Sequence, residues 1–248
     1  MARIDYNRVA ADYARGRGLT EDGLAAWRAA LQPHLDQLDL PVVDIGSGTG
    51  QFAALFPRWF GVEVVGVEPS EEMRAEAIAH TRDRRVTYLG AEAEHLPLAD
   101  GSCGAAWLST VIHHIPNLEA AAREVRRVVV PGGPVLIRSA FPGRTDRITL
   151  FQFFPEAAGV VETFPSIDQV ERDFGAAGFR LEEFEPVPQV SAGSLIEFRE
   201  RVALRADTTL RAMPDDAFAA GLARLDGAIS GGQESGPVVD YLDLVVLR

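Results

Sequence analysis

An apolar stretch that ends in three alternating glycines is the first feature of this sequence that could bind a ligand. It runs from Val42 to Gly50, with Gly46, Gly48 and Gly50 at its end. Glycine can adopt positive φ angles, and it lets a ligand approach the backbone without a Cβ atom in the way. The helix expected to follow begins with N–H groups that have no partner within the helix. We therefore expect an anionic or hydroxyl-rich part of a ligand to bind at this turn.

The next apolar run ends in a carboxylate, Glu68, which could bind a sugar. Residues 61–68 alternate and are rich in valine, which predicts a strand, and Glu68 ends it. In nucleotide-binding α/β folds, an acid about 20 residues after the glycine turn binds the ribose hydroxyls. A carboxylate suits this task because its two oxygens can accept hydrogen bonds from two neighbouring hydroxyls. We predict this role for Glu68.

The spacing of the glycines separates two kinds of nucleotide-like ligand. Dinucleotide-binding turns have the pattern G-x-G-x-x-G/A, which requires a small residue where this chain has Gln51. The pattern here is instead D-x-G-x-G-x-G, from Asp44 to Gly50. It resembles motif I of the class I methyltransferases that use S-adenosylmethionine (SAM). Residues 6–15 resemble the N-terminal segment of the ubiquinone-biosynthesis-like members of this family, and residues 117–138 resemble the helix, turn and strand that end their core.

The resemblance implies a set of contacts to SAM. Asp44 would lie near the amino group of the cofactor, and Glu92 would accept a hydrogen bond from the adenine amine. The complete implied set is Tyr13, Asp44, Gly46, Ser47, Gly48, Gly50, Glu68, Pro69, Met73, Ala91, Glu92 and Ser109. For Tyr13 and Met73, simple packing is the alternative.

Two adjacent histidines, His113 and His114, follow the fourth expected strand (residues 104–108). Ligands of open α/β sheets bind outside the carboxyl ends of the strands, so these side chains should face the transferred methyl group. An imidazole titrates near neutral pH and could take a proton from an attacking hydroxyl, amine or activated carbon. We predict that one of the two acts as a general base, and a structural or cofactor-contacting role is the alternative.

The fold implied by the resemblance is an α/β, Rossmann-like class I methyltransferase fold. Its sheet has seven mostly parallel strands in the order 3-2-1-4-5-7-6, with helices on both faces and a small helical lid. Residues 1–248 should form one domain. Its parts would be N-terminal helices within residues 1–35, a SAM-binding core at 40–140 and lid insertions within 141–235.

The residue patterns predict most elements of this fold. Besides the strand before the glycines, strands are expected at 61–68, 86–89, 104–108, 134–138, 179–184 and 238–247. Helices are expected at 5–14, 20–31, 51–56, after Ser70, and at 117–130, 166–177, 191–211 and 215–229. Residues 144–164 are too irregular to assign. Within them, Arg147, Phe151 and Phe154 are candidates for an apolar acceptor pocket, with ordinary packing as the alternative.

The composition limits the partners. The chain has 36 acidic and 24 basic residues and a formal net charge of −12, which disfavours nucleic acids and anionic membranes. Its single cysteine excludes an intramolecular disulfide and a multi-cysteine metal site, and we expect no metal. The N-terminus lacks a signal-peptide pattern, and no apolar run approaches the roughly 18 residues that span a bilayer. We expect a cytoplasmic protein with a small-molecule partner, and a homodimer is compatible with the sequence.

The expected activity is SAM-dependent transfer of a methyl group to O, N or C of a small-molecule acceptor, with S-adenosylhomocysteine (SAH) as product. Alignment of the attacking atom, the methyl carbon and the sulfur in one line would supply most of the acceleration. Three alternatives stay open. They are a SAM-binding protein that catalyses a cyclisation or decarboxylation, a non-catalytic binding protein, and a nicotinamide oxidoreductase, which the glycine spacing disfavours.

Overall fold

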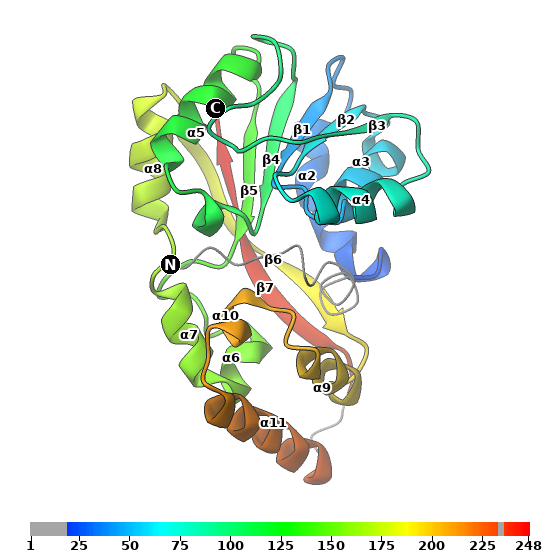
Figure 1. The fold of residues 1–248 in the computed structure, drawn as a ribbon, viewed down its shortest axis with the longest axis vertical. Helices are drawn as coiled ribbons and strands as arrows, with labels where there is room; N and C mark the ends of the chain where they lie inside the picture. Colours follow the sequence, from blue (N-terminus) through cyan, green and yellow to red (C-terminus); the bar gives the residue numbers. More distant parts are fainter. Residues whose placement is uncertain (1–18, 233–235) are drawn as a thin grey trace.

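A seven-stranded sheet is the centre of the protein (Figure 1). The computed structural model describes residues 19–232 and 236–248, so the predicted cofactor contact Tyr13 lies outside the described part. The strands are β1 (Val42–Ile45), β2 (Val64–Val67), β3 (Val86–Leu89), β4 (Ala105–Ser109), β5 (Val135–Ser139), β6 (Leu181–Ala192) and β7 (Val238–Leu247). Their order is β3-β2-β1-β4-β5-β7-β6. The first five are parallel, and β7 runs antiparallel to both β5 and β6. The predicted fold class and strand order are confirmed.

Helices connect the strands and cover both faces of the sheet. They are η2 (Asp22–Leu24), α2 (Ala25–Leu35), α3 (Gln51–Phe60), α4 (Glu71–His80), η3 (Ile112–His114), α5 (Leu118–Val128), α6 (Thr149–Phe153), α7 (Pro155–Val161), α8 (Ile167–Ala176), α9 (Leu195–Ala203), α10 (Thr208–Arg211) and α11 (Asp215–Ser230). Side-chain oxygens of Ser70, Asn117 and Ser166 accept the N-capping hydrogen bonds of α4, α5 and α8. These residue types are preferred at this position because they satisfy a backbone N–H that has no partner within the helix.

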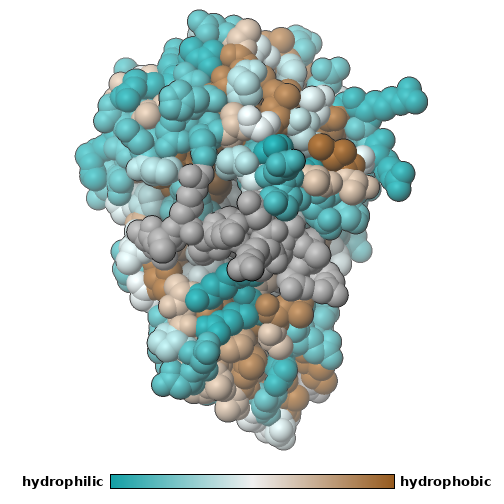
Figure 2. Space-filling model, in the orientation of Figure 1, coloured by the Kyte–Doolittle hydropathy of each residue, from teal (hydrophilic) through white to brown (hydrophobic). Residues whose placement is uncertain are grey.

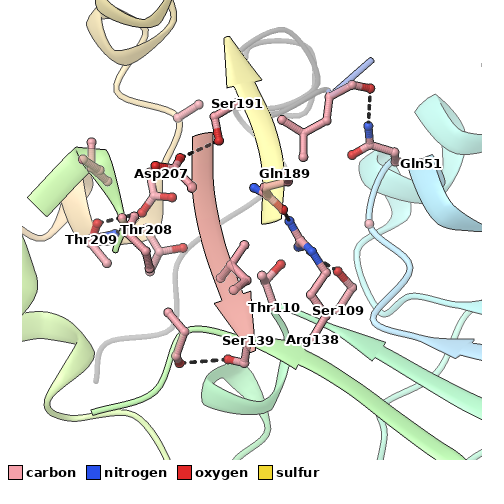
Figure 3. A pocket seen from close by; sticks show the side chains of 18 of the residues that line it. Gln51, Ser109, Thr110, Arg138, Ser139, Gln189, Ser191, Asp207, Thr208 and Thr209 are labelled. Carbon is pink, nitrogen blue, oxygen red and sulfur yellow. Dashed lines mark hydrogen bonds between the residues drawn. The ribbon is translucent and has the colours of Figure 1, made fainter. Parts of the chain in front are cut away.

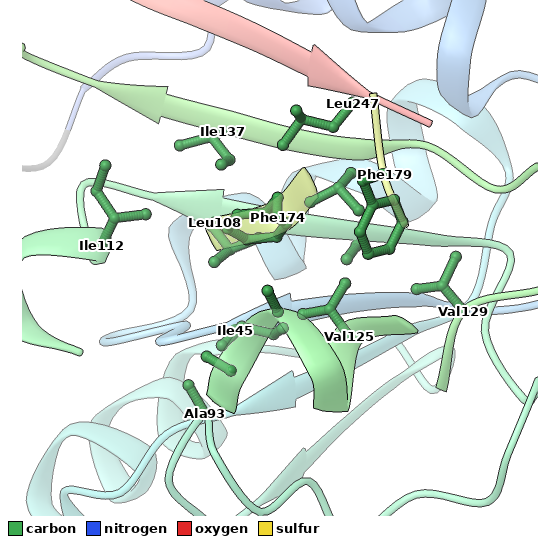
Figure 4. Packing of buried hydrophobic residues seen from close by; sticks show 14 of the residues in the cluster. Ile45, Ala93, Leu108, Ile112, Val125, Val129, Ile137, Phe174, Phe179 and Leu247 are labelled. Carbon is green, nitrogen blue, oxygen red and sulfur yellow. The ribbon is translucent and has the colours of Figure 1, made fainter. Parts of the chain in front are cut away.

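Two hydrophobic layers hold the helices on the sheet. On one face, α5 and α8 pack Val125 and Phe174 against strand residues such as Leu108 (Figure 4). The apolar residues of α5 recur every three or four positions, which places them on the stripe that faces the sheet. On the other face, α2 and α3 contribute an aromatic cluster in which the Phe52 ring lies 4.9 Å from that of Trp107.

The last two strands extend beyond the rest of the sheet. The final β5 residue, Ser139, pairs with Asp243, and from there Val187–Ala192 of β6 pair with Val238–Leu242 of β7. This two-stranded extension reaches into a separate group of helices, α6, α7, α9, α10 and α11 (Figure 1). These helices form their own hydrophobic cluster around Phe154 and Leu225. On the face in Figure 2, hydrophobic and hydrophilic side chains mix over these helices, and the upper part is mainly hydrophilic.

Two predictions of secondary structure were wrong in this region. The strand expected at 179–184 runs from Leu181 to Ala192, so it includes residues expected in a helix at 191–211. That helix is divided into α9 and α10, each N-capped by its own side chain, Ser194 and Asp207. The unassigned residues 144–164 contain α6 and α7. Over residues 19–232 and 236–248, no helix is long and apolar enough to cross a membrane.

Candidate functional site

The glycine turn leads from β1 into α3, and each of its three glycines has a positive φ angle: 68° at Gly46, 55° at Gly48 and 82° at Gly50. A Cβ atom on Gly46 would lie 2.2 Å from Val111, and one on Gly50 would lie 2.2 Å from the Tyr88 hydroxyl. A Cβ atom on Gly48 would have no described atom within 4 Å. Packing therefore requires glycine at the two ends of the turn, and the middle position is open for a ligand.

Glu68 holds this turn in place. Its two carboxylate oxygens accept hydrogen bonds from the backbone N–H groups of Gly48 and Ser70, each at 3.0 Å. The side chain is 9% exposed, and burial raises its pKa, an effect that the two N–H donors oppose. A carboxylate has about four lone-pair sites, so two remain for the hydroxyls of a diol.

Asp44 is a second buried carboxylate beside the turn, 2% exposed. Burial, and after it the charge of Glu68, raises the pKa of Asp44 to about 8. A cationic group of a ligand would favour the charged form of this carboxylate. The Ser47 hydroxyl next to it is buried and has no hydrogen-bond partner among the described residues. These residues fit a ligand that has an ammonium group and a diol, as SAM does.

A cavity of about 870 Å³ opens beside the turn. Five of the predicted cofactor contacts border it: Asp44, Gly46, Ser47, Gly48 and Ser109. It continues past the carboxyl ends of β4 and β5 to helices α6, α9 and α10 (Figure 3). Small-molecule cavities in proteins measure about 300–1,000 Å³, so this one lies in the upper part of that range.

The other predicted cofactor contacts within residues 19–232 do not border the cavity. Gly50 is the N-cap residue of α3. Glu68 accepts a hydrogen bond from Gly48, which does border the cavity. Met73 is almost fully buried in α4, and Ala91 packs against the hydrophobic layer beneath α5. Pro69 is exposed and Glu92 is half-buried on the loops after β2 and β3. Glu92, the expected adenine contact, therefore lies on the β2–β3 side of the turn, outside the cavity lining.

The structure separates the two histidines. His113 borders the cavity, and its imidazole stacks on the Phe164 ring with centroids 3.9 Å apart and planes at 4°. The His114 ring lies 4.0 Å from that of His113 and is not part of the cavity lining. The stacked Phe164 fixes the orientation of the His113 ring. Of the two predicted bases, His113 is the one that borders the cavity.

Only one of the three predicted acceptor contacts borders the cavity, and this is Phe151. Phe154 is fully buried, and its ring packs against Phe218, with centroids 5.7 Å apart. It fills the space beside Gly221 in the core of the helical group. Arg147 lies over the Tyr241 ring and borders a separate pocket of about 260 Å³. Phe154 and Arg147 are not part of the lining of the large cavity, so this geometry does not support their predicted contact with an acceptor.

The buried polar side chains that line the cavity next to β5, β6 and β7 were not predicted. Arg138, Gln189, Ser191 and Asp240 are buried and border the cavity. One signal was present, since Asp240 falls at an inward position of the correctly predicted strand 238–247, and a charge there is unusual without a function. Gln189 and Ser191 gave no such signal, because β6 was expected to end before them.

Thr110, directly after β4, also borders the cavity, and it has a φ angle of 52°. A β-branched residue with positive φ is strained, and such strain is concentrated at functional sites. Its N–H donates to the Arg138 carbonyl, which holds this conformation. The backbone after β4 is therefore fixed where the cavity passes the sheet.

Comparisons with known proteins agree with this geometry. Residues 43–137 match the family model described as a methyltransferase domain. An uncharacterized methyltransferase of Mycobacterium sp. (strain KMS) is 39% identical over 128 residues, 49% of this chain and 48% of the relative. A malonyl-[acyl-carrier protein] O-methyltransferase of Erwinia pyrifoliae is 30% identical over 146 residues, 57% of this chain and 53% of the relative. The matches thus span about half the length of these curated relatives.

A solved structure extends the likeness to the whole fold. The phosphoethanolamine N-methyltransferase 2 of Haemonchus contortus, in complex with phosphomonomethylethanolamine and SAH, superposes with a TM-score of 0.62 at 20% identity. The superposition covers 97% of this chain and 57% of that one. The sequence match over residues 43–137 and the strand order of the sheet lead to one assignment. Residues 43–137 match a methyltransferase domain, and the chain has the Rossmann-like fold of the class I methyltransferases.

Proposed function

We propose that the protein transfers the methyl group of SAM to an oxygen, nitrogen or carbon atom of a small-molecule acceptor. The observation that carries this proposal is the continuity of the cavity. It connects the glycine turn and Asp44 with side chains of α6, α9 and α10, so one space has room for a cofactor end and an acceptor. The acidic chain, with a net charge of −12, supports a small molecule over a nucleic acid.

SAM, when bound, supplies a methyl group on a cationic sulfur. In the proposed site, Asp44 holds the ammonium group, and the free lone pairs of Glu68 accept from the ribose hydroxyls. The helices beyond β5 orient the acceptor and exclude water, which favours in-line attack. His113 takes the proton from the attacking atom if that atom carries one. The helices beyond β5 thereby select the acceptor, and the residues at the carboxyl ends of β1 and β2 hold the cofactor.

A SAM-binding protein could also have a role other than methyl transfer. A shared fold does not determine the reaction, so a cyclase, a decarboxylase or a non-catalytic binding protein could have the same sheet. The curated relatives described above are methyltransferases, and this supports methyl transfer.

The proposal is tested by following the methyl group itself. The protein is incubated with SAM that carries a tritiated methyl group and a panel of small alcohols, phenols, amines and activated carbon acids. We expect label in an extracted product and an equal amount of SAH. Turnover that persists when SAH replaces SAM would contradict methyl transfer in favour of another reaction. SAM binding without any labelled product would favour a non-catalytic role.

A further inference from the structure

The extension of β6 and β7 forms a polar wall of the cavity. Gln189 and Ser191 alternate with outward residues on β6, and both are 7% exposed. Gln189 lies directly opposite Asp240 of β7 in the strand register. Side chains in such cross-strand pairs are neighbours on one face of a sheet. Figure 3 shows Gln189 and Ser191 together on this wall, between Arg138 and Asp207.

Two donors fix the orientation of the Gln189 amide. Its Oε1 atom accepts from the Trp27 indole at 3.2 Å and from the Arg138 guanidinium at 2.5 Å. An indole N–H and a guanidinium can only donate, so the oxygen must face them. The Nε2 atom therefore faces the cavity with two N–H donors, for which the described residues provide no partner. In Figure 3 the Gln189 nitrogen points away from Arg138.

Arg138 strengthens this donor and connects it to the cofactor end. Its guanidinium lies over the Trp27 and Phe52 rings, 5.2 and 5.5 Å from their centroids, and it also donates to the Ser109 hydroxyl. A charged donor on the amide oxygen polarises the amide and makes its N–H groups better donors. Arg138 thus links Gln189 to Ser109 at the end of β4, because it donates one hydrogen bond to each.

The carboxylates near this wall have partners within the protein. Asp240 accepts from the Thr149 backbone and from the Ser191 hydroxyl. Asp207 accepts from the backbone and the hydroxyl of Thr209. The wall therefore offers hydrogen-bond donors from Gln189 beside carboxylates that are already engaged. Other elements that line the cavity contribute apolar side chains, among them Phe151, Phe164, Phe198 and Val202.

We propose that the acceptor is a neutral, largely apolar molecule with an oxygen atom that accepts a hydrogen bond from Gln189 Nε2. This inference rests on the proposed function and specifies its substrate class. The oxygen is a carbonyl or a hydroxyl. An anionic group here would lie near Asp207 and Asp240, whose charges repel it, and the two arginines of the lining, Arg138 and Arg201, already donate to oxygens of Gln189, Ser109 and Ser191. A pure hydrocarbon would leave the buried amide donors unsatisfied.

One isosteric substitution tests the role of the amide. Gln189→Glu removes both N–H donors and keeps an oxygen that accepts from Trp27 and Arg138. The matched control is Gln32→Glu, which adds the same charge at an exposed position of α2. Both variants and the wild type are first compared in thermal unfolding, so that a folding defect is recognised.

The probes are naphthalene, 2-acetylnaphthalene, 2-naphthol and 2-naphthoate, titrated into SAH-saturated protein by ligand-detected NMR. We expect the wild type to bind the acetyl and hydroxyl probes about tenfold more tightly than naphthalene, as one added hydrogen bond predicts. The tighter of these two probes identifies the oxygen group. Naphthoate should bind more weakly than the acetyl probe. Gln189→Glu should reduce the preference for the acetyl probe over naphthalene to within about twofold, and Gln32→Glu should keep it.

Equal affinity of the wild type for naphthalene and the two oxygen probes, or no affinity for any of the probes, would overturn the inference. So would tightest binding of naphthoate, or a Gln189→Glu protein that keeps the acetyl preference. A titration of the wild type with SAH alone distinguishes failure of the proposed function from failure of the proposed acceptor class. Failure to bind SAH contradicts the proposed function, whereas SAH binding without the probe preference contradicts only the acceptor class.

Discussion

Asp44 and Glu68 are two buried carboxylates in one corner of the protein, and burial raises the pKa of both. For Asp44 the folded value is about 8, compared with an ordinary value of 3.8. Between these pH values the folded protein binds more protons than the unfolded chain. The free energy of unfolding should therefore fall as pH rises from about 4 to about 8, and Glu68 adds to this slope with the same sign.

The slope is measured by urea unfolding at several pH values from 5 to 8. Each proton taken up by the folded state changes stability by about 1.4 kcal/mol per pH unit. Asp44→Asn should flatten the slope and be more stable than the wild type at pH 8. Asp36→Asn, at an exposed aspartate at the end of α2, should keep the wild-type slope. If Asp44→Asn lost stability equally at every pH, the assignment of the slope to Asp44 would be refuted.

His113 is the side chain for which a catalytic test is most specific. If it takes a proton from the acceptor, His113→Asn should lower kcat about 100-fold, within the range for general bases. The affinity for SAH should change little, because the histidine faces the acceptor end of the cavity. Single-turnover rates with labelled SAM measure the first quantity, and calorimetry measures the second.

His114→Asn is the matched control, because its ring is adjacent but outside the cavity lining. It should keep kcat within a few-fold of the wild type. Equal losses of rate in both variants would mean that the pair has a structural role. An increase in KM alone for His113→Asn would mean that the residue binds the acceptor without moving a proton.

The glycine turn allows a comparison of two substitutions of the same type. Gly48→Ala adds a methyl group toward open space in the cavity, at a φ angle of 55°. It should cost about 1–2 kcal/mol of stability for the left-handed backbone and lower SAH affinity more than tenfold. Gly46→Ala places its methyl group 2.2 Å from Val111, so it should destabilise by roughly 2–5 kcal/mol.

Thermal or urea unfolding and SAH calorimetry on the two variants measure these effects separately. A Gly48→Ala protein with normal SAH affinity would show that no ligand passes close to this backbone.

Local patterns were sufficient to predict the elements of the sheet from the sequence. The strand Val86–Leu89 and the final strand Val238–Leu247 have the predicted bounds. Both are rich in β-branched and other apolar residues, and no helix pattern matches them. The prediction of one helix at 191–211 was wrong because the sequence keeps a helical pattern through the residues between α9 and α10. The N-cap at Asp207, where α10 begins, was therefore not recognised. Pro186 and Pro188 hid the length of β6, which tolerates them as an edge strand.

The two ends of the site differ in how much the sequence could show. The cofactor end is one contiguous turn, so its resemblance to motif I implied Asp44, Ser47 and Gly48 as contacts, and all three border the cavity. The acceptor end combines Arg138, Gln189 and Phe198 from separate elements. Their association depends on how far the β6–β7 extension passes β5, and no local pattern encodes that length.

The molecule as a whole consists of a sheet body and a helical group that meet at the cavity (Figure 1). Within the helical group, Phe154 lies in the hydrophobic core and Phe151 borders the cavity, so substitutions of the two should have different effects. Phe154→Ala should destabilise the protein by about 3–5 kcal/mol, because the side chain is fully buried beside Gly221. Phe151→Ala should cost less stability and weaken acceptor binding, because this side chain borders the cavity. Urea unfolding and probe titrations measure the two effects, and similar profiles for both variants would contradict this division.

The central claim is that the turn and its carboxylates bind SAM, and calorimetric titration with SAM and SAH tests it most directly. The wild type should bind both with micromolar affinity. Glu68→Ala should lower the affinity at least 100-fold, because it removes the diol acceptor and the anchor of Gly48. Glu63→Ala, at an exposed carboxylate just before β2, should bind like the wild type. A wild type that binds neither compound, or a Glu68→Ala protein that binds them normally, would contradict the account.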